Sequence, residues 1–383
     1  MDYYKRYTEA YHNTYLIKRE YLEHAVFVET SAMNEQLGNS FISNEDFDRF
    51  ILPFWQKYNE TPDKCYFEFY GSRDSVIDPL FIPKNIYVTK LLPYLNNLTF
   101  LYAYDDKCTN PERFPMVKQA KTIIRCMSGL FYDDRMNMIS RDKAISLCLA
   151  HNNKLVCKPS IYTSFGNGIL VIDPACFDYE KMSDTFLTLG ANFIVQDRIR
   201  QHPALEKLNP STVNTIRVNS LLSSDGVYIP YTTIRVGGKN EAIVGEGNDG
   251  WICEINSDNT LHSKSIPCIK VNKENDYTGL KWQKCPFSEN NGERYVVPSM
   301  DKVRDIIQKL HPLIPHFRWA GWDFTVDDEG DPVLIEVNLM PGDMTAQFAA
   351  CKPMFGKMTE AILDDYYIHR TLEKNQRQER LFE

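Results

Sequence analysis

The sequence lacks several features that would assign it to common classes of protein. No apolar run approaches the roughly 20 residues that a membrane-spanning helix requires. The first residues, Met1–Tyr7, are too polar and aromatic for a secretion signal. The 10 cysteines form no CxxC pair and no cluster with histidine, which argues against a zinc site. We therefore expect a cytoplasmic protein with reduced thiols.

The sequence also lacks an excess of basic residues. Its 43 lysines and arginines are outnumbered by 51 aspartates and glutamates, which gives a formal net charge of -8. A nucleic-acid-binding surface usually requires a basic patch, so we expect no nucleic-acid partner. Charged residues are 25% and hydrophobic residues 43% of the 383 residues, an ordinary balance for a globular protein with a large core.

The residue pattern predicts four parts. Residues 1–104 form an N-terminal, mainly helical module, and residues 362–383 form a charged C-terminal helix or tail. Residues 105–192 and 193–361 mix β-rich runs with helical stretches. In these two middle parts the pattern predicts β structure at 121–126, 154–158, 193–196, 215–223 and 227–236, and helices at 142–151 and 301–311.

Residues 321–338 are the most informative stretch, because they read as two strands joined by a polar turn. We predict a register in which Val326 lies opposite Val333. Strand side chains alternate between faces, so Asp323 then lies directly opposite Glu336 on one face of the hairpin. Two opposed carboxylates repel each other, and a bound divalent cation would remove that repulsion.

The same face carries Asn338, whose amide oxygen completes a set of hard oxygen ligands that suits magnesium. We expect this face to be open to solvent, so that removing Asp323 or Glu336 leaves the metal-free fold intact. An exposed hairpin with a polar outer face is the simpler alternative. The opposite face is apolar and is expected to pack inward, with Trp322, Phe324, Ile335 and Val337.

A second polar feature follows the predicted strand at 154–158. Lys158 stands at the strand end before Pro159, and residues 160–168 are rich in serine, threonine and glycine. Backbone N–H groups of such a loop can approach phosphate oxygens while a lysine supplies positive charge. The order differs from a Walker loop, in which the lysine follows the glycines. Lys154, at the other end of the strand, is expected to matter little.

Two arginines interrupt β-rich runs. Arg217 and Arg235 lie among apolar residues, where an unpaired guanidinium would be costly to bury. Each therefore needs an anionic partner, which is either a bound ligand or a structural salt bridge within the protein.

The order of these features resembles the ATP-grasp superfamily over residues 105–360. The shared elements are a lysine-proline and Ser/Gly loop, an apolar strand ending in Gln-Asp, strand arginines, and Asp…Glu-x-Asn followed by Pro-Gly. The stretches Asn209–Arg217 and Gly321–Asp323 are similar to sequence motifs of its sugar-transfer-associated branch. Members of that branch occur together with polysaccharide biosynthesis functions. The resemblance implies an α+β ATP-grasp fold, in which subdomains at 105–192 and 193–361 close on ATP.

The resemblance also implies two cofactors, ATP and Mg2+, and a role for each site residue. Lys158 would contact the α- and β-phosphates. Arg235, with Arg217 as a second candidate, would act in catalysis near the γ-phosphate, and Lys107 resembles a lysine that opens the ATP-grasp region. The other implied nucleotide-binding residues are Ser160, Gly166 and Gly168 of the phosphate loop and Gln196, Asp197 and Ile199 of the adenine-reading linker. The implied magnesium ligands are Asp323, Glu336 and Asn338.

The reaction class comes from the resemblance, which implies an ATP-dependent carboxylate-amine ligase acting through an acyl phosphate. The expected partners are a small-molecule or sugar-linked carboxylate and an amine, sugar-linked or amino-acid-like, in surface polysaccharide biosynthesis; a homo-oligomer is compatible with the sequence. Two alternatives stay open. One is an ATP-grasp phosphotransferase with Asp249 or Glu246 as base, and the other is a non-catalytic nucleotide-binding protein.

One position departs from the branch. After Arg235 the branch usually carries an asparagine followed by a Gly-Gly pair, whereas this chain has Glu246 within Gly245–Asp249. Glu246 adds negative charge where the acceptor is expected. A cationic acceptor, a changed substrate and reduced activity are all compatible with this departure.

Overall fold

The computed structural model describes residues 2–161, 168–238, 250–268, 280–290, 293–342 and 347–369. The chain forms two compact units. The helical unit comprises Met1–Asn96, Lys273–Lys281 and Gly342–Glu383, and the sheet unit comprises Asn97–Asn272 and Trp282–Pro341. None of the helices in the described ranges is both long enough and apolar enough to cross a bilayer.

The N-terminal part is mainly helical, as predicted. Ser43 and Asp63 accept backbone N–H groups and so begin the second and fourth helices. Residues 365–369 continue the C-terminal helix, and the predicted tail beyond them lies outside the described residues. The helical unit contains α1 (Asp2–Leu37), α2 (Asn44–Asp46), η1 (Phe47–Ile51), α3 (Leu52–Gln56), α4 (Lys64–Gly71), α5 (Lys84–Ile86), η2 (Tyr87–Leu91), α6 (Leu92–Leu95), η8 (Gly356–Met358), α13 (Thr359–Asp364) and η9 (Asp365–His369).

A buried glutamine ties the two ends of the sequence together within the helical unit. The side-chain oxygen of Gln347 accepts the backbone N–H groups of Ile82 (2.9 Å) and Met354 (3.0 Å), and its nitrogen donates to the Ile82 carbonyl (3.0 Å). Next to it, the rings of Phe69 and Phe348 stack with centroids 4.2 Å apart. The C-terminal segment is therefore an integral part of the N-terminal module.

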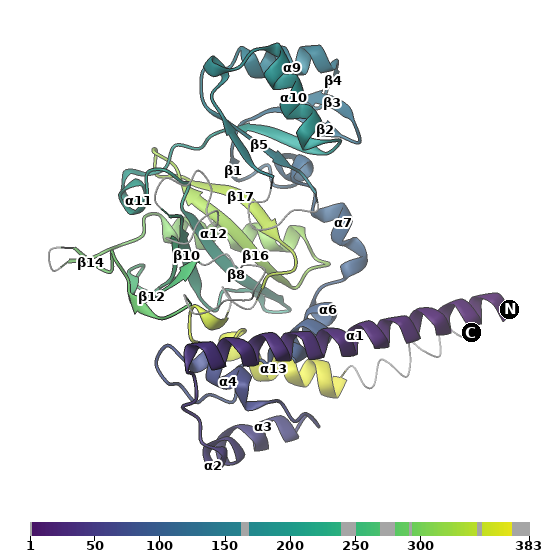
Figure 1. Ribbon diagram of the computed structural model, residues 1–383, viewed down its shortest axis with the longest axis vertical. Coiled ribbons are helices and arrows are strands. Elements are labelled where there is room, and N and C mark those ends of the chain that lie inside the picture. The colour runs from purple at the N-terminus through teal and green to yellow at the C-terminus, as the bar shows by residue number, and fades with distance from the viewer. Residues whose placement is uncertain are drawn as a thin grey trace. The chain divides into compact units, whose positions relative to one another are not determined.

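The smaller sheet of the sheet unit has the strand order β4-β3-β2-β7-β5-β6, with α9 and α10 covering one face (Figure 1). Strand alternation sends Leu155 and Cys157 into the core against these helices, so Val156 and Lys158 lie on the opposite face. The elements of this sheet are β2 (Thr122–Met127), β3 (Leu130–Asp133), β4 (Met138–Ile139), α9 (Arg141–Leu149), β5 (Leu155–Pro159), β6 (Leu170–Ile172), η5 (Pro174–Cys176), α10 (Tyr179–Leu189) and β7 (Phe193–Asp197).

The larger sheet has the order β1-β17-β16-β8-β10-β11-β12-β13, and β9 pairs with β8 (Figure 1). The run predicted at 227–236 is divided here, because residues 229–231 separate β9 from β10. Its strands are β1 (Lys118–Gln119), β8 (Thr215–Ser223), β9 (Gly226–Tyr228), β10 (Thr232–Val236), β11 (Gly250–Ile255), β12 (Leu261–Cys268), β13 (Gln283–Lys284), β16 (Trp319–Val326) and β17 (Pro332–Asn338). The remaining elements of the unit are η3 (Leu98–Phe100), α7 (Leu101–Tyr104), η4 (Lys107–Thr109), α8 (Asn110–Arg113), α11 (Pro203–Leu208), β14 (Glu289–Asn290), β15 (Glu293–Arg294), α12 (Met300–Leu310) and η6 (His311–Leu313).

The two faces of the larger sheet differ in character. One face is apolar and packs against the buried side of α12, in a cluster that includes Ile216, Val218, Trp322 and Phe324. The residues between them in sequence necessarily face the other way, so that face of β8 and β16 carries polar and charged side chains. The core thus positions the polar face without contributing to it.

On the apolar face of the larger sheet, a chain of three hydrogen bonds links β16 to β8 and to the segment that follows α12. The Trp322 indole N–H donates to Ser220 Oγ (2.8 Å), Ser220 Oγ lies 2.7 Å from His311 Nδ1, and His311 Nε2 lies 2.8 Å from the Phe317 carbonyl. The Phe317 carbonyl can only accept, so Nε2 carries a proton, and in the neutral imidazole Nδ1 then accepts the Ser220 hydroxyl proton. Burial lowers the pKa of His311 to about 4.

His311 should therefore make the folded protein acid-sensitive. Its folded-state pKa of about 4 lies below the unfolded value of about 6.5. The free energy of unfolding should fall as the pH drops from about 6.5 towards 4, because only the unfolded chain binds the proton in this range. The total loss should be roughly 3 kcal/mol. In urea unfolding at pH 7 and pH 4.5, wild type should lose more stability than His311→Leu, which lacks the titrating group. Equal losses would contradict the prediction.

Candidate functional site

The site is built on the hairpin of β16 and β17. Asp323 lies opposite Glu336, as predicted, but the register predicted at the turn is wrong, because Val326 pairs with Pro332. The ladder shifts between Asp323 and Phe324, which makes Ile335 an extra residue on β17. This bulge restores the Asp323–Glu336 pairing, and it is Leu334 rather than Ile335 that joins the core.

The main departure from expectation is the environment of Asp323. Arg217 on β8 lies opposite Asp323 and donates to both carboxylate oxygens, from Nε at 2.5 Å and from Nη2 at 2.8 Å. Both side chains are buried, with about 5% exposed. The prediction that Asp323 faces solvent is therefore wrong, and Arg217 forms the structural salt bridge that was one of its two alternatives.

One further hydrogen bond and the surrounding charges act on Asp323. Asn338 donates its amide N–H to Asp323 Oδ2 at 3.2 Å. Burial alone would raise the pKa of the Asp323 carboxyl, but the guanidinium of Arg217, with a smaller contribution from Arg235, holds this pKa below its usual range. Asp323 is consequently ionised without any metal, and the repulsion expected between Asp323 and Glu336 is already compensated.

Two lysines gather beside Glu336, whose side chain is 32% exposed. Lys107 Nζ lies 3.6 Å from Glu336 Oε2. Lys158 is buried, which lowers the pKa of its ammonium group to about 8; the carboxylate of Glu336 raises this pKa and the charge of Lys107 lowers it further. Asp105 also interacts electrostatically with Lys107 and Glu336, so two carboxyl groups accompany the two lysines, and burial raises the pKa of the Asp105 carboxyl. A bound anion would stabilise the buried ammonium group of Lys158.

The loop after β5 is partly described. Ser160 is buried, its backbone N–H donates to the Asn192 carbonyl, and its own carbonyl accepts the Lys107 backbone N–H, each at 3.0 Å. Gly168 has a φ of +76°, and a Cβ there would lie 2.9 Å from Pro159 Cγ, so a larger residue would be strained. Gly166 lies outside the described residues.

The linker residues after β7 have different surroundings. Gln196 is buried and donates to the Ala120 carbonyl at 3.1 Å, and Asp197 pairs with His151. These two side chains therefore have partners within the fold, whereas Ile199 lines a cavity.

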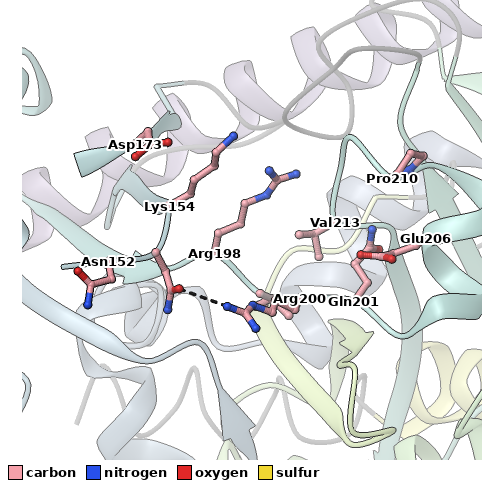
Figure 2. A pocket seen from close by; sticks show the side chains of 11 residues that line it. Asn152, Lys154, Asp173, Arg198, Arg200, Gln201, Glu206, Pro210 and Val213 are labelled. Carbon is pink, nitrogen blue, oxygen red and sulfur yellow. Dashed lines mark hydrogen bonds between the residues drawn. The ribbon is translucent and has the colours of Figure 1, made fainter. Parts of the chain in front are cut away.

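That cavity has a volume of about 400 Å³ (Figure 2). The Arg198 backbone N–H donates to the Lys154 carbonyl at 2.9 Å, which continues the β5–β7 ladder by one pair. By alternation, Lys154 lies on the same face as Lys158, and Figure 2 shows the Lys154 and Arg198 side chains extending in the same direction. Lys154 therefore lines this cavity, and the prediction that its replacement matters little for nucleotide binding stays a prediction. The cavity is lined by Asn152, Asn153, Lys154, Asp173, Arg198, Ile199, Arg200, Gln201, Glu206, Pro210 and Val213.

Arg235 differs from Arg217. It lies on the polar face of β10, is half-buried, and its Nε is fully covered without a hydrogen-bond partner in the described part of the chain. A guanidinium in this state favours an anion. Glu246 and Asp249 lie outside the described residues, so the predictions made for them stay predictions.

Sequence reasoning missed Lys154 and Arg198 as cavity residues. The signal was present, because Lys154 precedes Lys158 by four residues and Arg198 follows Gln196 by two, spacings that keep each on its neighbour's face in an extended strand. Three acidic side chains also cluster at Asp327, Glu329 and Asp331, but Lys118 already contacts the first two at 2.5 and 2.6 Å.

A family model described as "Sugar-transfer associated ATP-grasp" matches residues 99–362. This is more than half of the 383-residue chain, so the protein belongs to that family and has an α+β ATP-grasp fold with an N-terminal helical region. No curated protein matches the sequence.

Several solved structures are similar. The D-Ala:D-Ser ligase VanG from Enterococcus faecalis is 12% identical (TM-score 0.41), with 68% of this chain and 61% of that chain covered. The D-cycloserine synthetase DcsG is 11% identical (TM-score 0.39, 70% and 73% covered). An ADP complex of purK, N5-carboxyaminoimidazole ribonucleotide synthetase, is 12% identical (TM-score 0.35), and the match spans 63% of this chain and under half, 46%, of that chain. All three TM-scores are below 0.5, so the fold assignment rests on the family match.

The two carboxylates among the metal-ligand candidates on the hairpin should differ in their effect on stability. Asp323→Ala should lower the free energy of unfolding by about 3–5 kcal/mol, because it leaves Arg217 buried and unpaired. Glu336→Ala should change it little, since this carboxylate is a third exposed. Urea unfolding of both variants, with Arg217→Met and Arg217→Met/Asp323→Ala to complete the cycle, measures the coupling. Equal, small effects of both alanine variants would contradict the buried pair.

Lys158 should destabilise the ligand-free protein at neutral pH. Its folded-state pKa of about 8 lies below the unfolded value of 10.5, so burying the charge costs roughly 3 kcal/mol below pH 8, and this cost disappears as the pH rises from 8 to 10.5. Lys158→Met should therefore be more stable than wild type at pH 7 and close to it at pH 10. A stability difference that does not change with pH would show that Lys158 has its ordinary pKa.

Proposed function

We propose that this protein is an ATP- and Mg2+-dependent ligase that joins a carboxylate to an amine through an acyl phosphate. The observation that carries the proposal is the convergence of two lysines and two carboxylates: Lys107 and Lys158 lie beside Glu336, which lies opposite Asp323. Membership of the ATP-grasp family supports the use of ATP.

The nucleotide would lie on the face of the smaller sheet that carries Lys158. Ile199, with Lys154 and Arg198, would line the nucleoside end, where the cavity lies. Lys107 and Lys158 would meet the phosphates, and binding would return the Lys158 ammonium towards its ordinary pKa, because phosphate oxygens replace the solvation lost on burial.

The magnesium ion would be held by Glu336, Asp323 and Asn338. The residues fit such an ion, since all three supply hard oxygens and Glu336 is accessible. A carboxylate oxygen has about two acceptor positions; Oδ2 of Asp323 uses both, on Arg217 and Asn338, whereas Oδ1 uses one, on Arg217, and keeps the other for the ion. When bound, the ion would neutralise charge on the transferring phosphoryl group.

The protein residues would act by positioning and charge. A carboxylate of the first substrate attacks the γ-phosphorus; the new C–O–P bond forms, the bond to ADP breaks, and ADP leaves with the electron pair. The amine then attacks the carbonyl carbon, releases phosphate and loses one proton. Arg235, whose Nε has no hydrogen-bond partner in the described ranges, would neutralise the substrate carboxylate and the incoming phosphoryl oxygens. Sugar-linked acids and amines belong among the candidate substrates, because the family's description refers to sugar transfer.

The reaction class can be tested with hydroxylamine in place of the amine. A panel of simple, amino and sugar acids is incubated with ATP, Mg2+ and enzyme, and hydroxamate and phosphate are measured together. A ligase gives hydroxamate, ADP and phosphate in equal amounts for an accepted acid. A phosphorylated product that hydroxylamine does not cleave would identify a phosphotransferase instead, and the absence of ADP binding by calorimetry would overturn the proposal.

Lys158→Ala should weaken ADP binding roughly ten- to a hundredfold, because charge-assisted contacts contribute about 1.5–3 kcal/mol. The matched control is Lys143→Ala, an exposed lysine in the first turn of α9, which should not alter ADP affinity. Lys154 is unsuitable as a control because it lines the cavity. Equal effects of the Lys158 and Lys143 substitutions would remove Lys158 from the nucleotide site.

A further inference from the structure

The polar face of the larger sheet leaves several buried groups without hydrogen-bond partners. Among the described residues, Asn219 Oδ1, Thr233 Oγ1 and Thr325 Oγ1 have none, although these residues are no more than 1% exposed. Buried polar atoms in native proteins are nearly always paired, and an unpaired one costs about 1–3 kcal/mol. Several on one face of one sheet therefore require an explanation.

Their positions surround the Arg217–Asp323 pair. Thr233 lies directly opposite Arg217 on β10, and Asn219 lies two residues beyond Arg217 on β8. Strand alternation places all of these side chains on the same face. The row across the sheet runs through Glu336, Asp323, Arg217, Thr233 and Glu254, so Thr233 lies three strands away from Glu336 and beside the buried Glu254 on β11.

The side chain of Asn219 packs closely against a glycine. Gly321 lies opposite both Asn219 and Asn338, and a Cβ added at Gly321 would lie 3.1 Å from Asn219 Oδ1, 3.4 Å from Arg217 Cδ and 3.2 Å from Pro341 Cβ. Asn219 thus points its oxygen towards the position between the ion pair and the end of β17. This is one strand from the ligand candidates of the hairpin.

We propose that Asn219 and Thr233 form the floor of a subsite for the second substrate, which presents hydrogen-bond donors. The amide oxygen of Asn219 can only accept, so its partner must carry an N–H or O–H group, and Thr233 can accept or donate. The substrate class is an amine that also bears hydroxyl groups. The assignment of this molecule as the second substrate rests on the proposed function.

The distance between Thr233 and Asp323 suits a second substrate of small-molecule size. Strands in a sheet are about 4.8 Å apart, so Thr233 on β10 lies roughly 10 Å from Asp323 on β16, two strands away. A molecule bound on Asn219 and Thr233 can extend over Arg217 and reach the carboxylates of the hairpin. A small ion at the hairpin could not satisfy Thr233 at this distance.

The test uses glucosamine as the probe, because it carries one ammonium and several hydroxyl groups. Ligand-observed NMR measures its affinity for wild type with and without ADP and Mg2+. Asn219→Leu and Thr233→Val remove the polar atoms and nearly keep the shapes. Thr232→Val is the matched control, since Thr232 lies opposite Val218 on the other face of β10. Each test variant should weaken glucosamine roughly three- to tenfold, and the control should not.

Two parallel measurements separate the subsite from a role of these residues in nucleotide binding or in the fold. ADP affinity should be unchanged in both test variants, and the melting temperature should be unchanged or higher, because an unpaired buried polar atom has been removed. An equal loss of ADP affinity would assign the two residues to the nucleotide, and a lowered melting temperature relative to Thr232→Val would give them a structural partner. Either result overturns the subsite.

The experiment distinguishes a failure of the proposed function from a failure of the subsite. If wild type does not bind ADP, the nucleotide assignment fails, and the subsite is judged on glucosamine binding without nucleotide. If wild type does not bind glucosamine in either condition, the subsite fails regardless of ADP. Glucose, which lacks the amine, separates the two donor types: equal binding of glucose and glucosamine identifies hydroxyl groups as the recognised donors, and weaker glucose binding identifies the amine.

Discussion

The buried ion pair between Arg217 and Asp323 is the interaction on which the arrangement of the site depends. Asp323 lies between Arg217 on one neighbouring strand and Glu336 on the other, so it faces one favourable and one unfavourable charge at the same level of the sheet. In a nearly solvent-free position, a carboxylate stays ionised only with a close cation. Arg217 supplies that cation in two-point geometry, which fixes the orientation of the Asp323 carboxylate as well as its charge.

The apolar side of the same strands makes this possible. Trp322 and Phe324 flank Asp323 in sequence and are fully buried in the core, so the strand cannot rotate to expose Asp323 to water. The Trp322 indole is further held through Ser220 and the neutral imidazole of His311. Packing on one face therefore determines electrostatics on the other, because alternating side chains share one backbone.

The polar face combines satisfied and unsatisfied groups in a regular order. Glu336, at one end of a row across the sheet, meets two lysines from the smaller-sheet region, and Arg217 is neutralised in the middle. Arg235, Thr233 and Asn219 carry polar atoms that no group in the described part of the chain satisfies. Free energy invested in unpaired polar atoms is expected where a ligand completes the hydrogen bonds. The row thus distinguishes groups held for the fold from groups left for a ligand.

The sequence by itself determined the family, the helical character of the N-terminal part and the pairing of Asp323 with Glu336. These follow from local signals, namely residue order in motifs, strand alternation and helical periodicity. The tertiary structure decided that Arg217 neutralises Asp323, that Lys154 lies on the face of Lys158, and that a bulge brings Leu334 instead of Ile335 into the core. Each of these depends on which strands are neighbours or on one inserted residue. Arg217 and Asp323 are 106 positions apart. No local pattern encodes such a contact, because strand order and burial result from the packing of the whole sheet.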